Sequence, residues 1–331
     1  MVRTLQAGFP GAAITWIVGK LEHKLVGDLP GVEFVVVDKS QGWRIYPQLR
    51  STLSDRRFDV LLQCQVALRA NVLSALVRAD RKIGYDRSRS KDLHGLFVGE
   101  RIPDRPGVHV LDAIGSFVEP LGLQQTKVRW DIPVSEADEE FAMQALPGNQ
   151  PTLLLSPCSS HVVRNWRPER YAAVADRAAR EHGMRVALCG GRSALEREVA
   201  DAILAAMREP AVDLVGKDTL KQFLALARRA ALVLTPDAGP MHMANAAGAP
   251  VLGLHAASNP HRSGPYSSLE WSVDRYDAAA RKFRGVPASG LPWGTKLEYE
   301  GVMDLIETEA VMEALDRFAA SRKTGKSPAG D

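Results

Sequence analysis

Two side chains that can bind or activate a substrate, Asp237 and His242, flank a predicted turn between a strand and a helix. Residues 232–255 read as a buried strand, a sharp turn, a short helix of small residues and a second strand. The pattern places free backbone N–H groups, a carboxylate and an imidazole at the carboxyl end of a parallel strand, where α/β proteins bind phosphates. The alternative is an ordinary βαβ corner with a solvated aspartate and a helix-capping histidine.

A second group of polar side chains follows the predicted strand 152–155. The hydroxyls of Ser159 and Ser160 can donate hydrogen bonds to phosphate oxygens, and Arg164 can bind a diphosphate through two N–H groups. Because this loop leaves the carboxyl end of its strand, we expect it on the same rim as Asp237. A serine-rich loop with a surface arginine is the alternative.

Glu196 follows a third predicted strand, which ends in Gly190-Gly191. A carboxylate at this position can accept hydrogen bonds from ribose hydroxyls, as acidic residues do in other nucleotide-binding folds. A solvated helix residue fits the pattern equally well.

Motifs for several other kinds of chemistry are absent from the sequence. There is no GxGxxG after a strand, no GxxxxGK[ST], no pair of aspartates two positions apart and no metal-ligand spacing among the eight histidines. We therefore expect arginine, serine, histidine and helix N–H groups, rather than a metal or a cofactor, to meet the charge of a leaving diphosphate.

A basic segment, residues 78–92, holds six Lys or Arg against three Asp. We interpret it as a loop of the first domain that receives an anionic acceptor, such as a phosphorylated or carboxylated glycolipid. A solvated loop is the alternative. The candidate acceptor-binding residues are Arg81, Lys82, Arg87 and Arg89.

Composition indicates a globular protein. The chain has 331 residues, of which 45% are hydrophobic and 24% charged, and its net charge of +3 does not favour a nucleic-acid partner. Its three widely spaced cysteines are typical of reduced thiols, which favours the cytoplasm. No apolar run is long enough to span a membrane, and a peripheral contact with the inner membrane stays compatible with the sequence.

Strands and helices alternate along both halves of the chain, which predicts an α/β protein with two doubly wound parallel sheets. Two such domains are expected to face a cleft. The predicted parts are a first domain over 1–145, a second over 150–305, an amphipathic helix over 306–320 and a disordered tail over 321–331.

The motif residues resemble the signatures of glycosyltransferase family 9, the ADP-heptose:lipopolysaccharide heptosyltransferases. Asp237-Ala238-Gly239-Pro240-Met241-His242 is similar to the donor-site signature of that family, and Ser159-Ser160 with Arg164-Asn165-Trp166 is similar to a second signature. The resemblance implies the GT-B architecture, with two Rossmann-like domains and a C-terminal helix that packs back on the first. It also implies that heptose is transferred from ADP-heptose to the lipopolysaccharide inner core, with inversion and without a metal.

By matching position, the resemblance assigns the donor to one set of residues and places the acceptor in the first domain. The implied donor-binding residues are Ser159, Ser160, Arg164, Glu196, Asp237, Ala238, Gly239 and His242.

Family members open with a strand and a turn whose aspartate acts as general base on the acceptor hydroxyl. This chain begins after that point, so no residue is assigned as the base, and part of the first sheet is expected to be unpaired. Two other functions stay open: a non-catalytic sugar-nucleotide binder, and another GT-B enzyme such as a UDP-sugar transferase or an epimerase.

Overall fold

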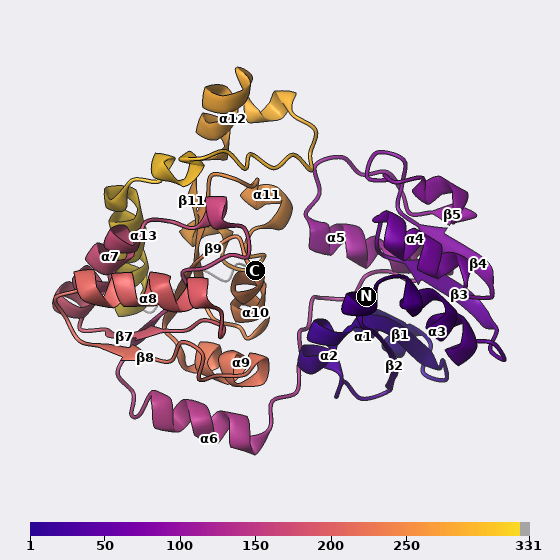
Figure 1. Ribbon diagram of the computed structural model, residues 1–331, viewed down its shortest axis with the longest axis horizontal. Coiled ribbons are helices and arrows are strands. Elements are labelled where there is room, and N and C mark those ends of the chain that lie inside the picture. The colour runs from indigo at the N-terminus through magenta and orange to yellow at the C-terminus, as the bar shows by residue number, and fades with distance from the viewer. Residues whose placement is uncertain (325–331) are drawn as a thin grey trace. The chain divides into compact units, whose positions relative to one another are not determined.

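The computed structural model describes residues 1–324, and the chain divides into two compact units, Met1–Pro133 and Val134–Asp331 (Figure 1). The boundary lies earlier than the predicted end of the first domain at residue 145. The cause is α6 (Glu136–Ala145), which packs on α9 (Leu220–Arg229) and so belongs to the second unit. Ser135 and Asp138 begin α6 with reciprocal capping hydrogen bonds.

The first unit contains two small parallel sheets in place of one. β1 (Ile14–Gly19) pairs with β2 (Val32–Val37), and β3 (Phe58–Gln63), β4 (Ala79–Gly84) and β5 (Glu100–Arg101) form the other sheet. Among the described residues β1 and β3 each pair with a strand on one side only. The helices of this unit are α1 (Val2–Gly8), α2 (Lys20–Val26), α3 (Ile45–Thr52), α4 (Leu68–Ala75) and α5 (Val110–Gly115).

The second unit is built on one six-stranded sheet in the order β11-β10-β9-β6-β7-β8, and every pair in it is parallel. The strands are β6 (Thr152–Leu155), β7 (Arg185–Leu188), β8 (Ala211–Asp213), β9 (Leu232–Pro236), β10 (Val251–His255) and β11 (Val273–Asp274). The remaining helices are α7 (Pro168–His182), α8 (Ala194–Ala206), α10 (Gly239–Ala246), α11 (Pro260–Ser263), α12 (Tyr276–Arg284) and α13 (Thr308–Lys323).

Alternate residues of the central strands serve two separate apolar cores, one on each face of the sheet. Leu153 and Leu155 of β6 pack in one core with α7 and α13, whereas Leu154 packs in the other with α9 and α10. All three leucines are fully buried. Burial on both faces explains why these strands read as continuous apolar runs.

Helix α13 packs within the second unit, and its predicted packing back on the first domain stays a prediction. Its buried residues Val311, Leu315 and Phe318 lie in the core that contains α7. Phe318 also meets Trp271 edge-on, with ring centroids 5.4 Å apart. The sequence defined an amphipathic helix but did not show which surface its apolar face would cover. Of the predicted tail, residues 321–323 are helical and 325–331 lie outside the described residues.

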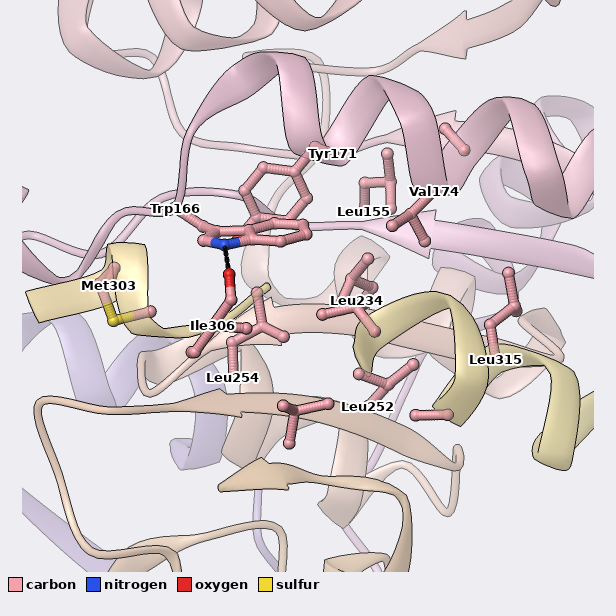
Figure 2. Close-up of a cluster of buried hydrophobic side chains, with 14 of the residues drawn as sticks. Leu155, Trp166, Tyr171, Val174, Leu234, Leu252, Leu254, Met303, Ile306 and Leu315 are labelled. Atoms are coloured by element: carbon pink, nitrogen blue, oxygen red, sulfur yellow. Dashed lines mark hydrogen bonds between the residues drawn. The ribbon is translucent and has the colours of Figure 1, made fainter. Parts of the chain in front are cut away.

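Trp166 ties the loop after β6 to the C-terminal part of the second unit (Figure 2). Its ring is 1% exposed and packs edge-on against Tyr171, and its Nε1 donates a hydrogen bond to the carbonyl of Ile306 at 2.9 Å. This anchor fixes the end of the loop that carries Arg164.

No helix of residues 1–324 is both long and apolar enough to cross a membrane.

Candidate functional site

The strand order of the second unit defines where a ligand is expected to bind. From β6 the chain adds β7 and β8 on one side, then returns to add β9, β10 and β11 on the other. The connections that leave β6 and β9 therefore diverge, and α/β sheets bind ligands outside the carboxyl ends of strands at such a switch point. The loop after β6 contains Ser159 to Arg164, and the turn after β9 contains Asp237. The sequence motifs thus meet at the switch point.

Asp237 is the buried centre of this site. Its carboxylate lies 3.0 Å from Lys296 Nζ, 3.9 Å from His242 Nε2 and 4.0 Å from Arg164 Nη1. Burial by itself would raise the pKa of the Asp237 carboxyl, but the charge of Lys296 and a hydrogen bond from Ser258 outweigh burial and lower the pKa to about 2. Asp237 is therefore anionic at neutral pH.

Arg164 ends a 3₁₀ helix, Val162–Arg164, and its side chain is only 15% exposed. The guanidinium is held by Glu298, because Nε donates to Oε1 at 2.8 Å and Nη2 donates to the same oxygen. Its remaining nitrogen, Nη1, faces Asp237. The prediction that Arg164 and Asp237 share one rim is confirmed.

The turn after β9 starts a helix as predicted. Gly239 begins α10, and Pro240 lies in its first turn, where its missing N–H removes no helical hydrogen bond. A side chain added at Gly239 would meet nothing within 4 Å, so the helix start is open to a ligand. Gly248, with φ of +83°, follows the end of the helix. The imidazole of His242 is 53% exposed on this helix.

The two serines differ in their surroundings. Ser159 is buried, its N–H donates to Asn165 Oδ1 at 2.7 Å, and its hydroxyl oxygen accepts from the N–H of His161 at 3.3 Å. Ser160 is exposed. A phosphate role for both stays a prediction.

Glu196 lies in the first turn of α8 and closes the glycine turn after β7. Its Oε1 accepts from the N–H of Gly191 and its Oε2 from the hydroxyl of Ser193, both at 2.6 Å. Both oxygens are thus already engaged, and a ribose would share or replace these partners. In the loop after β6, burial and then the Glu196 charge raise the pKa of Cys158 to about 11.

Three of the four predicted acceptor residues are engaged within the first unit. Arg81 and Lys82 lie in β4 rather than in a loop; Arg81 binds Glu100 through two 2.7 Å hydrogen bonds, and Lys82 donates to the carbonyl of Ser74 at 3.0 Å. Arg89 pairs with the buried Asp86. Arg87 is exposed. The loop interpretation is therefore wrong for residues 79–84, which form β4; strand β5 supplies the anionic partner and helix α4 the carbonyl partner.

Several residues of the site escaped the sequence analysis. Lys296 and Glu298 belong to an irregular segment far along the chain, and nothing in their sequence context indicates a site. His255, at the end of β10, is buried against Ser258, and burial lowers its pKa to about 4, so its ring is neutral. Asp218, in the loop after β8, has a pKa raised to about 6, first by burial and then by Glu196. Among residues 1–324 no three His, Cys, Asp or Glu side chains converge as a metal-ligand set.

Charged side chains that meet at the switch point of a parallel sheet, beside the start of a helix, are typical of nucleotide-binding α/β proteins. The family model for glycosyltransferase family 9 (heptosyltransferase) matches residues 47–285. The chain is 38% identical over 318 residues to a lipopolysaccharide core heptosyltransferase, OpsX, of Haemophilus influenzae, covering 96% of this chain and 91% of the relative. The chain therefore belongs to glycosyltransferase family 9 and is a glycosyltransferase.

Solved structures agree with this fold. A family 9 glycosyltransferase from Veillonella parvula superposes with a TM-score of 0.77 at 21% identity, covering 97% of this chain and 92% of that chain. The ADP-heptose lipopolysaccharide heptosyltransferase II of Escherichia coli gives 0.68 at 20% identity, with 97% and 93% covered. The Escherichia coli heptosyltransferase WaaC with ADP gives 0.70 at 15% identity, with 96% and 93% covered. The GT-B fold inferred from the sequence is confirmed.

Proposed function

We propose that this glycosyltransferase transfers a heptose from ADP-heptose to the inner core of lipopolysaccharide, with inversion and without a metal. The observation that carries the proposal is the meeting of Arg164, Asp237 and the start of α10 at the switch point of the second unit. The name of the 38% identical relative supports the sugar and the acceptor.

In the proposed reaction an acceptor hydroxyl attacks the anomeric carbon while the bond from that carbon to the diphosphate oxygen breaks. The sugar joins the acceptor, ADP leaves with the electron pair, and the hydroxyl proton passes to a base that we assign to no residue. Arg164 and the N–H of Gly239 at the start of α10 stabilise the charge that develops on the departing diphosphate. Asp237 is anionic and buried beside them, so we assign it to the hydroxyls of the donor sugar.

Calorimetric titration with ADP-heptose and with UDP-N-acetylglucosamine tests the donor. We expect heat only with ADP-heptose, and transfer to a lipopolysaccharide core acceptor. Arg164→Ala should weaken donor binding by about 1.5–3 kcal/mol, the range for a hydrogen bond to a charged group. The matched control is Arg317→Ala, an exposed arginine on α13.

Other results of these experiments would favour a different function or remove a residue from the site. Heat only with the UDP-sugar would refute the ADP-heptose donor and favour a UDP-sugar transferase or an epimerase. Donor binding without transfer would favour a non-catalytic sugar-nucleotide binder. Equal affinity in Arg164→Ala and the wild type would remove Arg164 from the donor site.

We further propose that the protein works in the cytoplasm and touches an anionic membrane surface through its first unit. Five large apolar side chains of this unit are more than half exposed, and four of them each lie in the segment that follows a different strand, β1 to β4. Each of these four also has a lysine or arginine one or two positions away. Apolar side chains interleaved with cations suit the interface of an anionic bilayer, where a lipopolysaccharide acceptor is held. The four apolar residues are Leu21, Trp43, Leu68 and Leu93.

Vesicle sedimentation tests the membrane contact. The wild type should bind phosphatidylglycerol vesicles more strongly than phosphatidylcholine vesicles, and added salt should weaken the binding. A Trp43→Ser/Leu93→Ser variant should lose most of it, whereas Val286→Ser, an exposed apolar residue of the second unit, should not. Equal binding by the two variants would refute the contact.

A further inference from the structure

Residues Thr295–Tyr299, here named the strap, cross the donor site of the second unit without forming a helix or strand. The strap is tied down at two points. Tyr276 Oη donates to the carbonyl of Thr295 at 3.0 Å, and the N–H of Leu297 donates to the carbonyl of Ala257 at 2.8 Å. The side chain of Leu297 is fully buried in the core. An anchored centre gives the two flanking side chains a fixed place.

Lys296 and Glu298, on either side of Leu297, both reach the charged groups at the switch point. Lys296 Nζ lies 3.0 Å from Asp237 Oδ2, and Glu298 binds the Arg164 guanidinium. The result is a row of alternating charges, Glu298–Arg164–Asp237–Lys296. Two of its members come from the motifs and two from the strap.

We propose that the strap is a second wall of the donor diphosphate site, in which Lys296 binds the diphosphate directly and Glu298 positions Arg164. This inference rests on the proposed function and adds two residues to the site. Both lie beyond residues 47–285, the part of the chain that the family model matches.

The geometry supports a direct role for Lys296. Lys296 Nζ and Arg164 Nη1 lie against the same oxygen of Asp237, at 3.0 and 4.0 Å, so the two cations flank one position. The Lys296 side chain is 31% exposed, which leaves its ammonium group accessible to a ligand. A diphosphate carries charge on two neighbouring phosphates, and two cations beside one position can each bind one of them.

The contacts of Glu298 support a positioning role. Glu298 occupies the edge of the guanidinium formed by Nε and Nη2. That pairing fixes the plane of the group and leaves Nη1 directed into the site beside Asp237. Arginine is pre-organised by its planar fork, so a partner on one edge orients the donors on the other.

The test measures binding of ADP and of inorganic pyrophosphate to the full chain by calorimetry. Lys296→Met should raise both dissociation constants about tenfold or more, the range for a lost hydrogen bond to a charged group, and Lys296→Arg should recover most of the affinity. Glu298→Gln keeps the shape and an acceptor oxygen but loses the charge, so we expect an increase of about threefold. The matched control is Glu300→Gln, an exposed carboxylate two positions further on, with wild-type affinity expected.

A double variant separates direct binding from simple neutralisation of Asp237. If Lys296 only neutralised that carboxylate, Lys296→Met/Asp237→Asn would bind pyrophosphate as the wild type does. We expect the double variant to stay weak. Thermal melting of each variant shows whether it is folded, and recovery by Lys296→Arg would not follow from a purely structural role.

Three results would overturn the proposal. Unchanged affinity in Lys296→Met would remove the lysine from the site, and recovery in the double variant would reduce it to a counter-charge. Tighter binding in Glu298→Gln would mean that Glu298 competes with the diphosphate for Arg164 rather than positioning it.

The wild-type titrations separate this proposal from the proposed function. If the wild type binds pyrophosphate but not ADP, the proposal that ADP-heptose is the donor is wrong. The proposal for the strap still holds in that case if the strap variants bind pyrophosphate more weakly than the wild type. If the wild type binds neither probe, the diphosphate site is wrong and both proposals fall.

Discussion

Trp166→Phe tests how the loop that carries Arg164 is held. The change removes the hydrogen bond from Nε1 to the carbonyl of Ile306 but keeps an aromatic ring against Tyr171. The lost hydrogen bond contributes about 1 kcal/mol. The smaller ring leaves roughly 40 Å³ unfilled, which at ~24 cal/mol per Å³ costs about 1 kcal/mol more. We therefore expect a loss of about 2 kcal/mol in the free energy of unfolding.

We expect Trp166→Phe to lower the free energy of unfolding by no more than this, because the carbonyl of Ile306 keeps a second hydrogen-bond donor. Arg170 Nη1 donates to the same oxygen at 2.6 Å. Without that bond the buried carbonyl would be unpaired, at a further cost of about 1–3 kcal/mol. Arg170→Leu in the Trp166→Phe background should therefore destabilise the protein by more than the two single changes added together.

Urea unfolding followed by far-UV circular dichroism measures these differences, with the slope m expected to stay constant. Because Arg164 lies two residues before Trp166, the single variant should also bind ADP more weakly. A loss above about 4 kcal/mol for Trp166→Phe alone would refute the role of Arg170 as second donor. Strict additivity in the double variant would refute it as well.

Three further changes probe other parts of the second unit. The pKa of Asp218 is raised to about 6 in the folded protein, from a value near 3.8 in the unfolded chain. Ionisation of Asp218 therefore lowers the free energy of unfolding as the pH rises above 3.8, and the loss is greatest above pH 6. Asp218→Asn should therefore exceed the wild type in unfolding free energy by up to about 3 kcal/mol at pH 7.5, with a gap that closes towards pH 4; a constant gap would contradict this. Phe318→Ala should cost about 3–5 kcal/mol in urea unfolding if α13 belongs to this core, and a loss below about 1 kcal/mol would contradict that placement. Gly183→Ala, at φ of +63° after α7, should lower the melting temperature through a cost of about 1 kcal/mol, and an unchanged melting temperature would argue against the left-handed turn.

Local signals in the sequence predicted much of the second unit. Thr219 and Gln222 form both hydrogen bonds of the predicted capping box at the start of α9. Gly183 ends α7 in the left-handed conformation, as a glycine at that position predicts. These features depend on residues a few positions apart, so the sequence alone is enough to define them.

Features that depend on distant residues were not predictable. Lys296 and Glu298 become site residues only because Leu297 is drawn into the core and Ala257 accepts its N–H. The pairing of Arg81 has a similar cause, since β5 brings Glu100 to it, and its role at the acceptor stays a prediction. In each case the partner is chosen by tertiary packing, which local composition does not encode.

The division of the first unit into two sheets has a consequence for local opening. β1 and β3 each leave one edge outside the hydrogen-bonded ladder of the described residues, and the apolar clusters beneath them are far smaller than the cores of the second unit. Amide protons on these strands should exchange with deuterium through sub-global openings, whereas those of β6 and β9 should exchange only through global unfolding. A protease acting on such openings would cut within the first unit first and leave the donor-binding half as its long-lived fragment.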